Sequence, residues 1–230
     1  MVRELEGPRL IYGPGVDKPL QAKRYLSYRA LQQAEELSAT KVLQVGSGLG
    51  DVLFYLAESL ESKVVGLSTQ NPWVGQATSV ALQKNKQHQI RFFAADPRDF
   101  RSYRPFPGQD MVLFYDMLSV AGLEVLEALG GILRPGGRLL VSGLFRTRDE
   151  DSILMYPGID EFLTLSDEKG FELLTNDEVS SGLRTTFADT LRAMYLAKTD
   201  PGSPKLQQIL EARKVKERSL EYRILVFVRR

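Results

Sequence analysis

The 230-residue sequence contains no cysteine and one histidine. The absence of cysteine excludes disulfides, thiolate zinc sites, iron–sulfur clusters and a cysteine nucleophile. The single histidine, His88, stands in "NKQHQI", just before an expected strand. We therefore expect a protein without a metal site. The lack of cysteine also fits a reducing, cytoplasmic location.

An excess of charge of either sign is also lacking, because 30 basic and 29 acidic residues leave a net charge of +1. This balance indicates no basic face for nucleic acid. The segment "MVRELEGPRLIYGPG" carries charges where a signal peptide has its apolar core. The longest apolar region, 111–145, is too short between charged residues to span a bilayer. We expect a cytoplasmic protein that binds neither membrane nor nucleic acid.

Short β-branched runs alternate with helical periodicity along most of the chain. Strands are expected over 41–45, 63–68, 90–95, 110–115 and 137–145, and helices over 51–60, 74–86 and 123–133. This alternation predicts an α/β fold with a doubly wound parallel sheet covered on both faces. The last third predicts a helix that ends at Gly170, a helix over 186–197, and strands over 171–179 and 222–228. No boundary linker is visible, so residues 1–230 are expected to form a single domain, with 1–40 and 145–205 contributing a substrate cap.

The segment "KVLQVGSGLGD" (41–51) leads from an expected strand into a helix through three glycines. Gly46, Gly48 and Gly50 have the spacing G-x-G-x-G, which allows the backbone to approach a ligand closely. A dinucleotide fingerprint has its third glycine one position later, where this chain has Asp51. A carboxylate there would repel a pyrophosphate. The loop therefore indicates a nucleoside ligand without phosphates, and a nicotinamide oxidoreductase is disfavoured.

Five segments occur in a recognisable order: "VLQVGSGLGD", "VVGLSTQNPWVGQA", "IRFFAADPRDF", "DMVLFYDMLSV" and "LRPGGRLLVSG". Through them, residues 38–180 resemble a class I S-adenosylmethionine-dependent methyltransferase. The resemblance is to the small-molecule branch, which includes ubiquinone-type, sarcosine/dimethylglycine and cyclopropane-fatty-acid enzymes. It implies a Rossmann-like, doubly wound, seven-stranded sheet that is mostly parallel with an antiparallel last strand, for which "YRILVFV" is suitably placed.

The resemblance implies S-adenosylmethionine as cofactor and S-adenosylhomocysteine as product. The loop backbone would face the methionine part, and a side chain at Gly46 or Gly48 should collide with it. Aromatic faces of Tyr12, Trp73 or Tyr115 could stabilise the sulfonium. The implied cofactor residues are Gln44, Gly46, Ser47, Gly48, Gly50, Ser68, Thr69, Asp96, Pro97 and Tyr115.

Three of these residues depart from the family pattern. Gln44 replaces the usual acid and keeps a carbonyl acceptor without a negative charge. Ser68 stands where an acid binds the ribose, and it would equally serve as a strand-end hydroxyl that satisfies nearby backbone. Asp96 is expected to accept from the adenine amino group, whereas Pro97 has no N–H to donate to the adenine ring.

The implied reaction is methyl transfer to a small-molecule acceptor, for which the protein aligns the reactants and excludes water. Asp116 is the leading candidate for a general base, ahead of a tyrosine in "RYLSYR" (24–29) or Asp160. Asp116 could instead orient an ammonium group. His88 is expected at the opposite end of the sheet, and Val120 occupies the position at which relatives often have a histidine. Arg146 and Arg148 would either bind an acidic substrate group or pair with surface acids.

Two other functions remain alternatives on the same fold. One is an enzyme that binds S-adenosylmethionine without using its methyl group and catalyses a cyclisation or rearrangement. The other is a non-catalytic binding subunit. Both are suggested by Gln44, Ser68, Pro97 and the missing histidine, and the fold alone does not choose among them.

Overall fold

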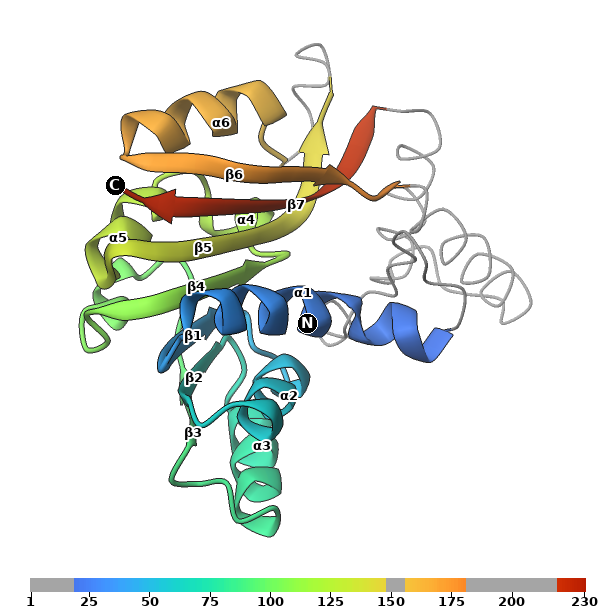
Figure 1. The fold of residues 1–230 in the computed structure, drawn as a ribbon, viewed down its shortest axis with the longest axis vertical. Helices are drawn as coiled ribbons and strands as arrows, with labels where there is room; N and C mark the ends of the chain where they lie inside the picture. The colour runs from blue at the N-terminus through green and yellow to red at the C-terminus, as the bar shows by residue number, and fades with distance from the viewer. Residues whose placement is uncertain (1–18, 148–155, 181–218) are drawn as a thin grey trace.

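A computed structural model describes residues 19–147, 156–180 and 219–230 (Figure 1). The helix expected over 186–197 lies outside the described residues, as do Tyr12, Arg148 and most of the expected substrate cap. Within these ranges, no helix is both long and apolar enough to cross a membrane. The same ranges contain no cluster of three or more side chains suited to a metal ion.

Seven strands form one mixed sheet in the order β3-β2-β1-β4-β5-β7-β6 (Figure 1). Neighbouring strands from β3 to β5 are parallel, while β7 lies between β5 and β6 and runs antiparallel to both. This confirms the predicted doubly wound sheet with an antiparallel last strand. The strands are β1 Lys41–Val45, β2 Lys63–Ser68, β3 Ile90–Ala94, β4 Gln109–Tyr115, β5 Leu133–Arg146, β6 Phe171–Glu178 and β7 Leu220–Arg229.

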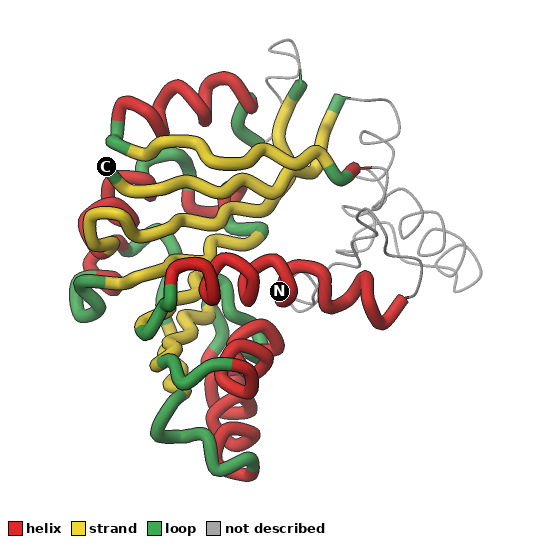
Figure 2. Tube along the Cα trace, viewed as in Figure 1, coloured by secondary structure: helices red, strands yellow, loops and turns green. Residues whose placement is uncertain are grey.

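Helices cover both faces of the sheet, as Figure 2 shows. One core forms against α1 Pro19–Leu37, α2 Asp51–Ser59 and α3 Asn71–Gln83. The other forms against η1 Phe100–Tyr103, α4 Leu118–Ala121, α5 Val125–Ile132 and α6 Ile159–Glu168. Successive residues of each strand alternate between the two cores. Leu113 and Tyr115 of β4, for example, face α1, whereas Val112 and Phe114 face α5.

Two local features differ from the predicted elements. The four-residue helix α4 was not predicted, because one turn is too short to show helical periodicity. The "RPGG" segment was expected to precede its strand, but Leu133 already pairs with Gln109 of β4, and pairing resumes at Arg138 with Met111. The segment is therefore a bulge within β5, and Gly136 adopts a left-handed conformation there (φ 74°).

The strand β7 lies between β5 and the edge strand β6. Nine of its residues pair with β5, from Leu220 opposite Arg146 to Val228 opposite Arg138. Because β7 runs against β5, its first residues lie at the carboxyl ends of the parallel strands. Tyr222 is thereby placed opposite Leu144 at that edge, with its side chain completely buried.

The amino edge of the sheet is held by the carboxylate of Asp110, at the start of β4 as expected. It accepts hydrogen bonds from the Thr40 and Lys41 N–H groups at 2.8 and 3.0 Å, from the Thr40 hydroxyl, and from Arg134. Burial by itself would raise the pKa of Asp110, but these donors, Arg134 foremost, hold the pKa below its ordinary value. The β1 and β4 ends are thus joined by one half-buried carboxylate.

Replacing Asp110 by asparagine should lower the free energy of unfolding by about 1–3 kcal/mol at pH 7, because charge-assisted hydrogen bonds are lost. A carboxylate with a lowered folded pKa stabilises the fold above its unfolded pKa of about 3.9 and loses that effect as the pH falls through the folded value. Urea unfolding of Asp110→Asn and wild type should therefore differ at pH 7, and the difference should shrink as the pH falls below about 4. Glu127→Gln, which removes an exposed pair with Lys169, is the control and should change stability little at either pH. A constant difference between Asp110→Asn and wild type across this range would contradict the assignment.

Candidate active site

The glycine loop between β1 and α2 is curled by left-handed backbone at each glycine. The φ angles are 77° at Gly46, 53° at Gly48 and 86° at Gly50. This region favours glycine, because other residues meet a steric penalty there. The Gly46 and Ser47 N–H groups both donate to the Leu67 carbonyl of β2 at 2.9 Å, so the loop is fixed against the neighbouring strand.

The side-chain directions at two of these glycines correct the expectation from sequence. A Cβ at Gly46 would lie 2.6 Å from Cγ of Met117, and one at Gly50 would overlap the ring of Phe92. The absence of a side chain at Gly46 therefore makes room for Met117. A collision of such a side chain with a ligand had been expected from the sequence. Ligand contacts at Gly46 and Gly50 themselves would come from the backbone.

Two buried polar groups beside the loop lack partners among the described residues. Gln44 of β1 is 4% exposed and Ser47 is 6% exposed. The Gln44 Oε1 and Ser47 Oγ atoms make no hydrogen bond within the described structure. Burying an unsatisfied polar group is costly, and most such groups in folded proteins are paired. A polar ligand lying on the loop would satisfy both.

The residues at the end of β2 and just after it differ in their exposure to solvent. Ser68 is buried, and its hydroxyl accepts a hydrogen bond from the Gln70 N–H at 3.4 Å, so it supports the strand end. Thr69 is exposed at the next position. Trp73 lies in the first turn of α3, as the sequence predicts, and is half-buried.

The residues after β3 show a pairing that the sequence did not indicate. Both carboxylate oxygens of Asp96 accept from the Arg98 side chain, at 3.1 and 2.9 Å, and this hydrogen bonding lowers the pKa of Asp96. The pair is exposed, so its net stabilisation is small and a ligand can compete for the carboxylate. Pro97 is buried, and its carbonyl accepts from the Tyr103 hydroxyl at 2.6 Å. Asp99 caps η1 by accepting from the Arg101 N–H.

Tyr115 and Asp116 follow one another at the carboxyl end of β4. The Tyr115 hydroxyl is directed at the Leu26 carbonyl of α1, 3.5 Å away, and burial raises the pKa of this phenol. Asp116 is half-buried and has a left-handed backbone (φ 57°), which is rare for residues other than glycine and is found often at functional sites. Its N–H donates to the Ser142 carbonyl of β5 at 2.8 Å.

Tyr222 is a site residue that sequence reasoning missed. Its hydroxyl donates to Oδ2 of Asp116 at 3.1 Å and lies 3.1 Å from the hydroxyl of Ser142. The alternation of β7 indicates that Tyr222 is inward-facing, but its partner depends on the insertion of β7 beside β5. No local signal in "EYRILVFV" points to Asp116, which is 106 residues away.

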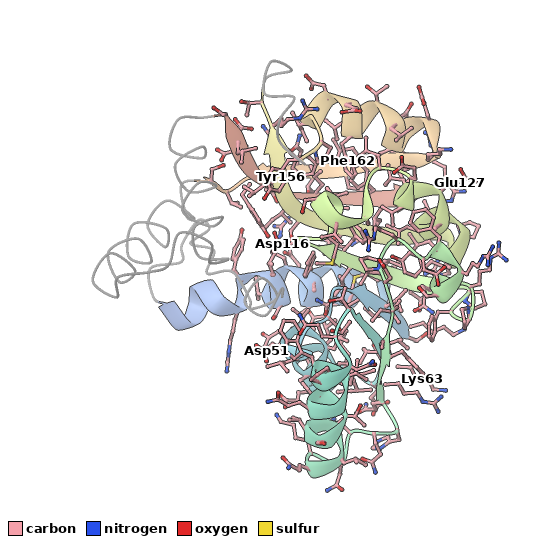
Figure 3. All side chains as sticks on the ribbon, turned by 180° about the vertical axis from the view of Figure 1, so that it is seen from behind. Asp51, Lys63, Asp116, Glu127, Tyr156 and Phe162 are labelled. Carbon is pink, nitrogen blue, oxygen red and sulfur yellow. The ribbon has the colours of Figure 1, made fainter. Side chains whose placement is uncertain are left out.

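The other candidate residues are spread over the molecule. Figure 3 shows Asp51, Asp116 and Tyr156 toward one edge of the sheet and Lys63, which begins β2, at the opposite edge. His88 is exposed in the loop before β3, at the amino end as expected. Val120 is 44% exposed on α4. Asp160 is exposed in the first turn of α6, where a carboxylate suits the helix dipole.

Arg146 has protein partners in place of the acidic substrate group considered above. Its Nε donates to the Tyr156 carbonyl at 2.6 Å, and its guanidinium lies 3.6 Å from Glu161. The surface acids expected to pair with it, 149–151, lie outside the described residues.

A cavity of about 450 Å³ opens at the carboxyl end of β6, beside α1. It is lined by Tyr25, Tyr28 and Arg29 of α1 and by residues 176–179. Arg29 bridges its two walls through an ion pair with Asp177 at 2.6 Å. Burial raises the pKa of the Tyr25 hydroxyl, which disfavours this tyrosine as a base. The Val179 N–H, from a residue that lines the cavity, donates to the carbonyl of Tyr222. The cavity therefore lies beside the residue of β7 whose hydroxyl contacts Asp116.

Comparisons with known proteins place the chain among structures of one architecture. No protein-family model matches it. Over 174 residues it is 22% identical to the O-methyltransferase rstn1 of Aspergillus nomiae, covering 68% of this chain and 76% of that protein. A putative sarcosine dimethylglycine methyltransferase from Galdieria sulphuraria superimposes with a TM-score of 0.78 at 14% identity, covering 96% of this chain and 92% of that one. The chain has the fold of the S-adenosylmethionine-dependent methyltransferases.

Two further structures show the chemical range of this methyltransferase fold. The geranyl diphosphate C-methyltransferase of Streptomyces coelicolor, solved with S-adenosylhomocysteine, matches with a TM-score of 0.74 at 13% identity, covering 99% of this chain and 94% of that one. The [4+2]-cyclase SpnF matches with a TM-score of 0.74 at 21% identity, covering 96% of this chain and 87% of that one. The resemblance read from the sequence is thus confirmed. At these low identities, what the superpositions establish is the fold.

Replacing Gly46 by alanine should lower the free energy of unfolding by about 1–3 kcal/mol, because the new Cβ meets Met117 and the backbone is left-handed. Gly75→Ala is the matched control. Gly75 lies in α3, has nothing within 4 Å of a new Cβ, and should gain about 0.5–1 kcal/mol from higher helix propensity. Urea unfolding measures both changes. Equal stabilities of Gly46→Ala and wild type would disprove the described packing of the loop.

Proposed function

We propose that the protein is an S-adenosylmethionine-dependent methyltransferase that acts on a small-molecule acceptor. The observation that carries the proposal is a pair of buried oxygens beside a left-handed glycine loop, Gln44 Oε1 and Ser47 Oγ, which have no hydrogen-bond partner in the part of the chain that the structure describes. The methyltransferase fold presents this loop at the carboxyl edge of its sheet, where open α/β sheets bind ligands. The cysteine-free sequence and the net charge of +1 support a cytoplasmic protein without a nucleic-acid partner.

The residues around the loop fit the polar groups of this cofactor. Gln44 would accept from the ammonium group through Oε1, and the backbone of residues 46–48 would line the methionine part. Asp96 would exchange its exposed pairing with Arg98 for the adenine amino group, with Ser68 and Thr69 near the ribose. Asp51, at the first turn of α2, disfavours a phosphate-bearing ligand. When bound, S-adenosylmethionine supplies an electrophilic methyl group on a good leaving group.

The chain's own contribution to the reaction is alignment and proton handling. The Asp116 carboxylate, held at the carboxyl end of β4, would accept a proton from the acceptor at one oxygen or orient an amine. The cavity of about 450 Å³ between α1 and β6 has the size of a small-molecule site and would receive the acceptor. Closure around it would exclude water from the transfer.

Gln44→Leu should weaken S-adenosylmethionine binding about tenfold or more, because a hydrogen bond to a charged group is lost. Its fold should be as stable as wild type or more stable, since an unpartnered buried acceptor is removed. The matched control is Gln109→Leu at the amino edge, which loses a bond to the Phe106 carbonyl and should keep wild-type affinity. Calorimetric titration and urea unfolding measure the two effects. Unchanged affinity in Gln44→Leu would refute this placement of the cofactor.

Asp116→Asn should lower turnover at least about tenfold while changing cofactor affinity less than threefold, if Asp116 handles the acceptor's proton. The measurement is formation of S-adenosylhomocysteine with a panel of hydroxyl, amine and activated-carbon acceptors, alongside calorimetry. Equal losses in both would assign Asp116 to holding the cofactor.

A second candidate is a non-methylating enzyme that keeps S-adenosylmethionine for structure. The exposed Val120 in place of a histidine suits both this candidate and a non-catalytic subunit, and the similarity to a [4+2]-cyclase favours the enzyme. The same panel of acceptors separates the candidates. A cyclase would bind S-adenosylmethionine in the calorimetric titration but would release no S-adenosylhomocysteine with any acceptor.

A further inference from the structure

Asp116, Ser142 and Tyr222 form a connected polar cluster from three neighbouring strands. Ser142 and Tyr222 have no exposed surface, while Asp116 is half-buried at the edge (Figure 3). The Tyr222 hydroxyl lies 3.1 Å from Asp116 Oδ2 and 3.1 Å from the Ser142 hydroxyl. The Ser142 carbonyl accepts the Asp116 N–H at 2.8 Å. Both backbone and side chain of Asp116 are therefore held from the β5–β7 pair.

The chemistry of these groups sets the direction of the hydrogen bonds. A carboxylate only accepts, so the proton between Tyr222 and Asp116 belongs to the phenol. With its own proton committed, the phenol oxygen can accept from the Ser142 hydroxyl. The chain then runs from Ser142 through Tyr222 to Asp116. A buried phenol without a partner would be costly, so Tyr222 depends on Asp116 as much as Asp116 depends on Tyr222.

The left-handed backbone of Asp116 is strained, and other contacts must offset the free energy of that strain. A non-glycine residue at φ 57° carries strain of about 1 kcal/mol or more, and such strain persists where surrounding contacts determine it. Contacts of this kind here include the bond to the Ser142 carbonyl and the bond from Tyr222. Together they turn one carboxylate oxygen toward β7.

We propose that Tyr222 is a positioning residue, which holds the Asp116 carboxylate in one orientation at the carboxyl edge of the sheet for reaction with the acceptor. The inference rests on the proposed function in giving Asp116 a chemical role. Tyr222 contributes its hydroxyl to the site from the last strand of the chain.

Among the described residues, the charged groups nearest Tyr222 on α1 and β7 pair with other side chains. Arg29 of α1, which opposes the effect of burial on the pKa of Tyr115, is paired with Asp177 of β6. On β7, Glu221 and Arg223 flank Tyr222, face the other side of the strand, and pair with each other. Tyr222 donates to the ionised form of Asp116, so removing that donor should make the carboxylate easier to protonate.

The test uses the full chain labelled with carboxyl-¹³C aspartate. The NMR signal of Asp116 is identified by its loss in Asp116→Asn, and its pH titration is followed in Tyr222→Phe, which keeps the buried ring. We expect the signal to move at pH 7 and its titration midpoint to shift to higher pH. Turnover should fall about tenfold, the effect of one lost hydrogen bond, with cofactor affinity unchanged.

Tyr103→Phe is the matched control for the NMR measurement. Tyr103 is also fully buried, and its hydroxyl donates to the Pro97 carbonyl on the other face of the sheet. This variant should lose comparable stability and leave the Asp116 signal in place. If Tyr222→Phe does not fold, Ser142→Ala replaces it and should move the signal in the same direction by a smaller amount.

An unmoved Asp116 signal in Tyr222→Phe, or an equal movement in Tyr103→Phe, overturns the inference whatever the activity. The NMR result does not require turnover, so failure of the proposed function is recognised separately. Full activity of Asp116→Asn, with a moved signal in Tyr222→Phe, would remove Asp116 from the proposed chemistry and with it the catalytic purpose of Tyr222.

Discussion

The antiparallel pairing of β7 with β5 is the interaction on which the rest of this structure depends. It inserts the last strand of the chain between β5 and β6, and its nine paired residues supply inward-facing side chains to both cores. Without it β6 would have no neighbour, and the carboxyl end of β5 would be an open edge. The same pairing carries Tyr222 to Asp116, so the strand that completes the sheet also shapes the candidate site.

The two edges of the sheet treat their polar groups differently. At the amino edge the Asp110 carboxylate is saturated by backbone, hydroxyl and guanidinium donors, and the buried Gln109 amide also has a partner. At the carboxyl edge Gln44 and Ser47 are as deeply buried but have unpartnered oxygens within the described structure. Internal saturation stabilises the fold, whereas unsatisfied buried groups beside a glycine loop favour a ligand. The asymmetry follows the rule that open α/β sheets bind ligands at the carboxyl ends of their strands.

Two departures from the pattern that the resemblance implies leave neutral groups near the glycine loop. Gln44 and Ser68 provide neutral oxygens where the resemblance implies acids, and the Ser68 hydroxyl is partly used by the Gln70 N–H. Asp116 then carries the negative charge at the end of β4, under the control of a neutral phenol. A site of this kind relies on hydrogen-bond geometry more than on ion pairing. Its function is therefore sensitive to the packing of β5 and β7.

The sequence by itself determined the order and type of the strands and of the helices α2, α3, α5 and α6, because alternation and helical periodicity are local properties. The 63–68 strand was predicted with its observed bounds, and the three glycines marked the loop, since their spacing reflects backbone conformation. The tertiary structure alone decided what those residues touch. Met117 fills the space beside Gly46, and Tyr222 reaches Asp116. Both contacts come from sheet pairing between distant segments, which a residue's own neighbourhood in the sequence does not record. The pairing of Asp96 with Arg98 is local, two residues along the chain, but the sequence does not show that the turn after β3 directs the two side chains toward each other.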